Sequence, residues 1–282
     1  MNICHVCTWN DDRATFRYRV GIPAPELWTL GHAVHVNDAP MEGATNVWHK
    51  HGKYLPWDLF EPGRDAFDVT DDHFAGDKRK HYTDICEKAR IVTTSSPAMA
   101  DRIKVETGRD ALYIPDALEF PIIAHEWHGG RSCMWFGHGA NFATLASVKI
   151  DCPLEIVTNC SRPGSRTNVR MTPWSHNAML RAFKRHDIVI IPQGKDAKSQ
   201  AKGNNRAVNA LAQGKFVVAH PTPSHKELED FIYVTDDILE GIQWGRAHPE
   251  NVAVMVAAGQ VYAAWRYSAN ASASAWADAL ED

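Results

Sequence analysis

The chain has 282 residues, enough for two domains of roughly 100–200 residues each. Its 44% hydrophobic and 23% charged residues exclude disordered and fibrous proteins, and its net charge of -4 does not indicate a nucleic-acid-binding protein. No apolar run approaches the ~20 residues that span a bilayer. The start of the chain lacks the features of a signal peptide, so we expect a cytoplasmic protein, in the host cytoplasm if it is viral.

The first half predicts alternating strands and helices. Strands are expected at 3–9, 33–37, 66–69, 91–94 and 111–114, with helices at 25–30, 78–89 and 96–108. The strands are short, apolar and rich in β-branched residues, which is typical of parallel strands covered on both faces. Cys4 and Cys7 have the spacing of metal ligands, but residues three apart in a strand point to opposite faces, so we expect no metal there. The six cysteines are not expected to form disulfides.

The alternation restarts after residue 128. Strands are expected at 133–137, 154–158, 187–192 and 216–219, with helices at 179–184, 206–212 and 268–282. Trp276 and Leu280 share one side of the last helix, which predicts packing against a core. The sequence therefore predicts an α/β fold with two Rossmann-like domains, 1–128 and 129–267, facing a cleft.

A polar loop and a helix start follow the third strand of the second domain. Asn204 or Asn205 is expected to cap this helix, whose backbone N–H groups and dipole favour an anion. Lys202 and Arg206 add positive charge, and Gly203 permits close backbone approach. The pattern predicts a site for a nucleotide diphosphate; the alternative is a solvated basic loop capped by asparagine.

The order of segments from 187 to 228 resembles the donor-binding part of a known enzyme family. Residues 187–192 (DIVIIP), 202–206 (KGNNR), 207–214 (AVNALAQG), 215–219 (KFVVA) and 223–228 (PSHKEL) follow one another. This order is similar to that of the retaining GT-B glycosyltransferases related to glycogen and sucrose synthases. The resemblance implies a nucleotide-sugar donor, a UDP- or GDP-sugar, and transfer of a hexosyl or pentosyl group.

The first half carries further parts of the resemblance. Residues 17–24 (RYRVGIPA) resemble the family's opening loop, 86–100 (CEKARIVTTSSPAMA) its central strand and helix, and 113–117 (YIPDA) its next strand end. Residues 268–280 resemble the closing helix that crosses back onto the first domain. One departure is clear: the family's two glutamates, eight positions apart, are replaced by Ala201 and Asn209. Asn204, Asn205, Arg206 or Glu227 are expected to substitute in binding the donor.

Polar residues that follow predicted strands supply the other candidate site residues. Asp71, Asp72 and His73 are expected to act in the cleft on acceptor or sugar hydroxyls, with His73 as a candidate base. Asp68-x-x-Asp71-Asp72 could instead bind a metal ion. Because lysine and arginine can neutralise the diphosphate, we expect no metal requirement and no tightly bound cofactor. The Gly137-His138-Gly139 loop is expected to approach the diphosphate.

The acceptor is expected to enter along Arg17, Tyr18 and Arg19. A compact enzyme of this type suits a hydroxymethylated pyrimidine in bacteriophage DNA, with Arg17, Arg19 and the basic residues 49–53 near phosphates. A cell-surface glycan or a small molecule are alternative acceptors. A catalytically silent nucleotide- or partner-binding protein on the same fold is an alternative from another class. A dehydrogenase is disfavoured because no Gly-x-Gly-x-x-Gly follows the first strand.

Overall fold

A computed structural model describes residues 1–7, 14–49, 55–160 and 168–281. The chain forms two compact units that are each assembled from separate segments. The first comprises Met1–Glu119, Asp196–Gly203 and Trp265–Asp282, and the second comprises Phe120–Lys195 and Asn204–Ala264. The first long segment ends at Glu119, whereas the sequence predicted the division after residue 128.

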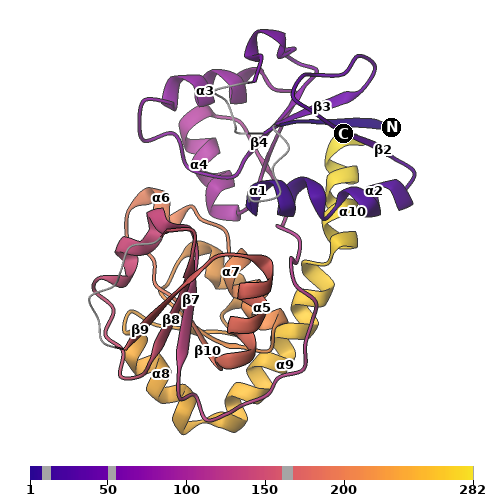
Figure 1. The fold of residues 1–282 in the computed structure, drawn as a ribbon. Coiled ribbons are helices and arrows are strands. Elements are labelled where there is room, and N and C mark those ends of the chain that lie inside the picture. Colours follow the sequence, from indigo (N-terminus) through magenta and orange to yellow (C-terminus); the bar gives the residue numbers. More distant parts are fainter. Residues whose placement is uncertain (8–13, 50–54, 161–167, 282) are drawn as a thin grey trace. The chain divides into compact units, whose positions relative to one another are not determined.

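The first unit is built on a parallel six-stranded sheet in the order β2-β1-β3-β4-β5-β6. Figure 1 labels β2, β3 and β4 of this sheet. Its strands are β1 (Asn2–Val6), β2 (Ala33–Asn37), β3 (Thr45–His49), β4 (Ala66–Val69), β5 (Ile91–Thr94) and β6 (Leu112–Tyr113). All pairings are parallel, which brings the carboxyl ends of the strands to one edge of the sheet.

Helices cover both faces of this sheet. The helical segments are α1 (Ala14–Phe16), η1 (Arg17–Gly21), α2 (Ala24–Thr29), η2 (Trp57–Leu59), α3 (Arg79–Lys88), α4 (Pro97–Thr107), α6 (Ala197–Gln200) and α10 (Ala269–Glu281). α3 and α4 share one core cluster with the sheet, and α2 and α10 share another with its opposite face. Trp276 and Leu280 are buried in the second cluster, which explains why the C-terminal segment that begins at Trp265 belongs to the first unit.

Local sequence fixes the limits of α4. The Ser96 hydroxyl accepts a hydrogen bond from the Met99 amide at 3.1 Å, and Pro97 occupies the first turn, where its missing N–H has no consequence. The helix ends at Gly108, whose φ of 72° lies in the left-handed region that favours glycine. These are the limits that the sequence predicted.

The second unit contains another parallel six-stranded sheet, in the order β12-β11-β10-β7-β8-β9. Its strands are β7 (Cys133–Phe136), β8 (Leu154–Thr158), β9 (Val169–Pro173), β10 (Ile188–Ile191), β11 (Phe216–Ala219) and β12 (Tyr233–Val234). In chain order within the unit, this arrangement is the 3-2-1-4-5-6 order of dinucleotide-binding α/β sheets, read from the other edge.

The helical segments of this unit are η3 (Gly139–Leu145), α5 (His176–Arg185), α7 (Asn205–Ala212), η4 (Pro223–Leu228), α8 (Ile238–Ala247) and α9 (Pro249–Arg266). α8 and α9 pack on the face that carries Ile188 and Ile190 of β10. α5 packs on the opposite face, where the rings of Phe183 and Phe136 lie 5.5 Å apart. Within the described ranges, no helix combines the length and hydrophobicity needed to cross a bilayer.

Candidate functional site

The sheet of the second unit has a topological switch point between β7 and β10. These strands are neighbours, but the chain continues from β7 toward one edge of the sheet and from β10 toward the other. Open α/β sheets bind ligands outside the carboxyl ends of such strands. β7 leads directly into Gly137, and β10 leads toward the start of α7, so both segments expected to bind the donor follow this point.

The Gly137–His138–Gly139 loop is held tightly against β8. The Gly137 amide donates to the Val157 carbonyl at 3.2 Å, and the Gly139 amide donates to Oδ1 of Asn159 at 2.8 Å. A Cβ on Gly139 would lie only 2.7 Å from the Cβ of Cys160, so a larger residue would displace the loop. His138 is exposed, and its Nδ1 accepts from the Ala140 amide, which caps η3.

Asn204 occupies the N-cap position of α7 without capping it. Its side chain makes no cap hydrogen bond; instead Nδ2 donates to Oε1 of Glu227 and to the Ser224 carbonyl, the latter at 3.4 Å. The predicted capping by its carboxamide is therefore wrong: a cap needs Oδ1 to accept from an amide of the first helical turn, and Oδ1 makes no such bond. Asn205 is the first helical residue, and its carbonyl accepts from Nδ2 of the buried Asn209 at 2.9 Å.

Arg206 brings the helix start and the glycine loop together. Its Nη1 donates to the Phe136 carbonyl at 3.4 Å and lies 3.6 Å from where a Cβ on Gly137 would be. A half-buried guanidinium thus lies at the carboxyl end of β7 and in the first turn of α7, the positive end of the helix dipole. This combination favours an anionic ligand.

His225, a histidine close to Arg206, was not predicted from the sequence as a site residue. His225 is buried, and its Nδ1 lies 2.8 Å from the His220 carbonyl. Burial, opposed in part by this hydrogen bond, together with the charge of Arg206, lowers the pKa of His225 to about 4. It is therefore neutral near pH 7. The signal in the sequence was its place in the turn after β11, the strand next to the switch point.

Lys202 and Gly203 belong to the first unit. They follow α6, which is capped by Asp196 through a hydrogen bond from the Ser199 amide at 3.0 Å. A Cβ on Gly203 would lie 3.2 Å from the Ser95 carbonyl, and the Ser96 hydroxyl donates to the Ala201 carbonyl at 2.8 Å. This short segment is thus fixed at the carboxyl end of β5, while residues 204–264 belong to the second unit.

The segment Asp71-Asp72-His73 follows β4, and its three side chains differ in accessibility. Asp72 is 5% exposed; its Oδ1 accepts from the Phe74 amide at 2.9 Å, and its Oδ2 lies 3.4 Å from Nε of Arg102. Asp71 and His73 are half-buried, and the His73 ring lies 4.7 Å from the Tyr82 ring. Asp72 therefore fixes the turn, and Asp71 and His73 are the more accessible members of the predicted trio.

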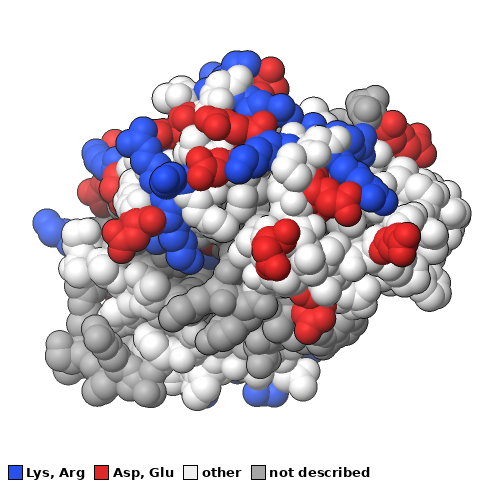
Figure 2. Space-filling model, turned by 90° about the horizontal axis from the view of Figure 1, so that it is seen from above, with Lys and Arg blue, Asp and Glu red and all other residues white. Residues whose placement is uncertain are grey.

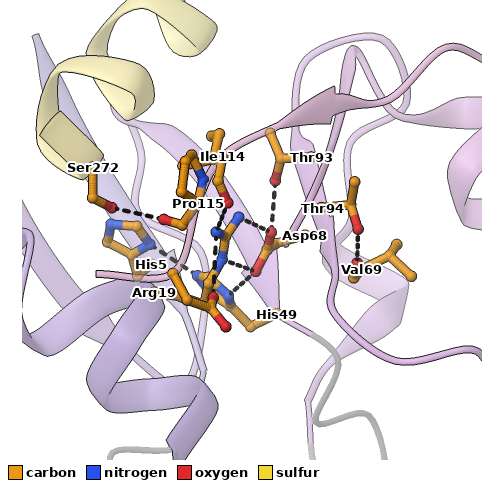
Figure 3. Close-up of polar contacts among 11 residues, drawn as sticks. His5, Arg19, His49, Asp68, Val69, Thr93, Thr94, Ile114, Pro115 and Ser272 are labelled. Atoms are coloured by element: carbon orange, nitrogen blue, oxygen red, sulfur yellow. Dashed lines mark hydrogen bonds and ion pairs between the residues drawn. The ribbon is translucent and has the colours of Figure 1, made fainter. Parts of the chain in front are cut away.

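The residues expected to guide the acceptor are mostly engaged within the first unit. Nε of Arg17 and the hydroxyl of Tyr18 both donate to the Glu119 carboxylate, at 2.6 and 2.7 Å. Arg19 is fully buried: its Nη2 donates to Oδ1 of Asp68 at 2.7 Å, and Nη1 donates to the Ile114 carbonyl (Figure 3). Arg19 is thus inaccessible to an acceptor, because its guanidinium is used inside the fold.

Asp68 is the centre of a buried polar network that the sequence analysis did not find. It accepts hydrogen bonds from Arg19 and from the Thr93 hydroxyl at 2.8 Å, and Nδ1 of His49 lies 3.1 Å from its Oδ2 (Figure 3). His5 Nδ1 lies 2.9 Å from Nε2 of His49. Although burial opposes ionisation, Arg19 and His49 hold the pKa of Asp68 below its usual value. Burial and the neighbouring His49 place the pKa of His5 well below 6.5.

No protein-family model and no curated protein matches the chain. Solved structures do. The chain is similar to HepE from Anabaena in complex with UDP-glucose, with 12% identity, a TM-score of 0.69, and coverage of 100% of this chain and 99% of HepE. A glycosyltransferase from Rickettsia africae gives 10% identity, a TM-score of 0.68, and coverage of 99% and 97%. The chain has the GT-B fold.

The GT-B fold is shared with longer proteins as well. The match to TarM has 9% identity and a TM-score of 0.62, and it covers 85% of this chain but only 55% of TarM. The chain therefore spans about half the length of that neighbour, in contrast to its full coverage of HepE. At these identities the similarity establishes the architecture.

Charge on the GT-B surface is mixed on the face that Figure 2 shows. Lysine and arginine side chains are interleaved there with aspartate and glutamate, and the described residues form no broad patch of one sign. Residues 50–53 of the predicted basic cluster lie outside the described part of the chain. Among the described residues, no group of three or more histidine, cysteine, aspartate or glutamate side chains is arranged to hold a metal ion.

Proposed function

We propose that this protein is a glycosyltransferase that moves a sugar from a nucleotide-sugar to an acceptor hydroxyl. The observation that carries the proposal is the contact of Arg206 with the end of β7, beside Gly137, at the switch point of the second sheet. A cation, a helix N-terminus and a glycine loop there suit a diphosphate. The GT-B fold and the UDP-glucose bound by HepE favour a UDP-sugar as donor.

In this proposal the donor residues have distinct tasks. Arg206 and the first turn of α7 bind the diphosphate, and the Gly137–His138–Gly139 loop lets its oxygens approach the backbone. Asn204, Asn205 and Glu227 contact the ribose or the sugar, replacing the missing glutamate pair. Lys202 and Gly203, which directly precede Asn204 in the chain, are proposed donor-binding residues as well.

The chemistry follows from where charge develops. The acceptor oxygen forms a bond to the anomeric carbon, while the bond from that carbon to the phosphate oxygen breaks and leaves its electron pair on the diphosphate. Arg206 and the α7 dipole stabilise this charge. We assign His73, or Asp71, to receive the acceptor proton, and Asp72 to hold their turn through Phe74 and Arg102.

A thermal-shift screen against UDP, GDP, ADP and their sugars tests the donor site. A ligand that binds only the folded state raises the melting temperature, and we expect UDP or a UDP-sugar to do so. Arg206→Ala should weaken binding at least roughly tenfold, because a charge-assisted hydrogen bond contributes about 1.5–3 kcal/mol. Arg181→Ala, which removes an exposed arginine of α5, is the matched control and should bind normally. Equal affinity in both variants would refute the site.

A silent binding protein is the second candidate, because Ala201 and Asn209 replace the glutamate pair and Asn209 is buried. Release of UDP from UDP-glucose in the presence of an acceptor distinguishes the two. The acceptors tested include glycans, small alcohols and DNA with hydroxymethylated pyrimidines. The DNA tests the hypothesis that this is a phage enzyme that modifies DNA. The anomeric configuration of the product distinguishes retention from inversion. Nucleotide binding with no transfer to any acceptor would favour the silent protein.

A further inference from the structure

Two cysteines at the opposite end of the second sheet from the proposed donor site lie in direct contact. Cys133 is the first residue of β7, and Cys152 lies two residues before β8. Their Sγ atoms are 3.2 Å apart. The Cys133 amide donates to the Pro153 carbonyl at 3.0 Å, so the ladder between β7 and β8 fixes the two backbones beside each other.

The environment makes the two thiols unequal. Cys133 is fully buried, whereas Cys152 is 6% exposed and lies between two exposed residues, Asp151 and Pro153. Arg246 is anchored beside them: Nη1 binds Oδ1 of Asp151 at 2.8 Å, and Nε donates to the Gly130 carbonyl at 2.9 Å.

These surroundings favour a thiolate on Cys152. The hydrogen bond from Cys133 and the charge of Arg246 lower the pKa of Cys152, while the same hydrogen bond and burial raise the pKa of Cys133. By contrast, burial raises the pKa of Cys7 and of Cys86, to about 12 in each case. Reactive cysteines are typically thiolates that a nearby cation stabilises.

We propose that Cys133 and Cys152 form a redox modification site that closes to a disulfide when the protein meets a peroxide. The Cys152 thiolate attacks one peroxide oxygen, the O–O bond breaks, and the released hydroxide takes up a proton to become water. Cys152 is then a sulfenic acid. The Cys133 sulfur attacks the Cys152 sulfur, and its proton leaves with the hydroxyl group as a second water. The peroxide gains the two electrons that the two thiols lose.

The disulfide would join the two ends of the segment that carries β7, the Gly137–His138–Gly139 loop and η3. The pair lies at the amino end of β7, and the loop lies at its carboxyl end, so oxidation is expected to restrain the segment without occupying the proposed donor site. The inference does not depend on the proposed function.

Thiol counting on the full chain tests the proposal. The protein is treated with hydrogen peroxide or with a reductant, then denatured and labelled with N-ethylmaleimide. The reduced protein should take up one label for each of its six cysteines, and the oxidised protein two fewer. Trypsin cleaves after Lys149 but not between Arg162 and Pro163, so the disulfide should join peptide 132–149 to peptide 150–166, and fragmentation should place it at Cys152.

Peptide 150–166 also contains Cys160, which is half-buried and lies 3.8 Å from the Thr158 hydroxyl. Cys160→Ser is therefore the matched control: it should keep the cross-link, whereas Cys152→Ser should lose it. Full labelling of the peroxide-treated protein, or fragment ions that place the link at Cys160, would overturn the proposal. The fragment ions are measured on the wild-type protein, so this result does not depend on whether the variants fold.

Discussion

At the scale of single residues, Arg19 and Asp68 show how a buried pair depends on both members. Both side chains are fully buried, and Arg19 lies over the Trp276 ring at 4.8 Å. Neutralising Asp68 would remove the carboxylate that binds the buried guanidinium at 2.7 Å and leave it only the more distant Asp116, 3.6 Å from Nη1. We expect Asp68→Asn to lower the free energy of unfolding by about 3–5 kcal/mol, measured by urea denaturation.

Asp110→Asn is the matched comparison. Asp110 pairs with Lys104 at 2.9 Å, but its side chain is 87% exposed, and the lysine is 52% exposed. Exposed pairs contribute little because water screens them, so this change should lower stability by less than about 1 kcal/mol. An equal loss of unfolding free energy in both variants would mean that the buried ion pair stabilises the fold no more than the exposed one.

At the scale of elements, sequence patterns predicted most of the buried strands and also the half-exposed edge strand β2. The expected strands at 33–37, 66–69, 91–94, 154–158 and 216–219 coincide with those observed. β9 was missed because it is an edge strand with half-exposed, mixed residues (VRMTP). β12 has only two residues, too few for a periodic signal.

The candidate donor site could be predicted less completely than the strands. Glycine, asparagine and arginine at a strand–helix junction suggested an anion site, and the structure places Arg206 against the end of β7. The bond from Asn204 to Glu227 could not be predicted, because it depends on how η4 packs near α7. The network around Asp68 could have been found from the sequence. His5, His49 and Asp68 each follow an apolar core residue by two positions, and residues two apart in a strand lie on the same face. The three core residues are Ile3, Val47 and Ala66.

The C-terminal helices provide a second test at this scale. Trp276 of α10 is fully buried in the core of the first unit, whereas Trp265 of α9 is 70% exposed. Trp276→Ala would remove a large core side chain and is expected to cost about 3–5 kcal/mol of stability. Trp265→Ala should cost less than about 1 kcal/mol. Chemical unfolding followed by circular dichroism checks both; equal losses would contradict the assignment of α10 to the core.

At the scale of the whole molecule, buried titratable groups predict stability that is greatest near neutral and mildly alkaline pH. On the alkaline side, Cys7 and Cys86 have pKa values raised by burial to about 12, above their ordinary 9.0. The unfolded chain therefore releases these protons first, and stability falls as the pH rises above 9. Urea midpoints should be lower at pH 10 than at pH 8.

The acid side depends on His5 and His225, whose pKa values burial lowers below 6.5, to about 4 for His225. Below pH 6.5 the unfolded chain binds protons that the folded chain does not. Their contribution is therefore complete above pH 6.5 and is lost as the pH falls toward the folded pKa. Each group contributes a slope of up to about 1.4 kcal/mol per pH unit inside its range.

His225→Asn isolates one of these groups, because the asparagine amide can still donate to the His220 carbonyl but does not titrate. We expect the wild type to lose more stability than this variant between pH 7 and pH 4.5, measured by urea unfolding at half-unit steps. The difference should develop below pH 6.5, where unfolded histidine gains its proton. Parallel profiles would mean that His225 is protonated equally in the folded and unfolded chain, and hence that it is not held neutral beside Arg206.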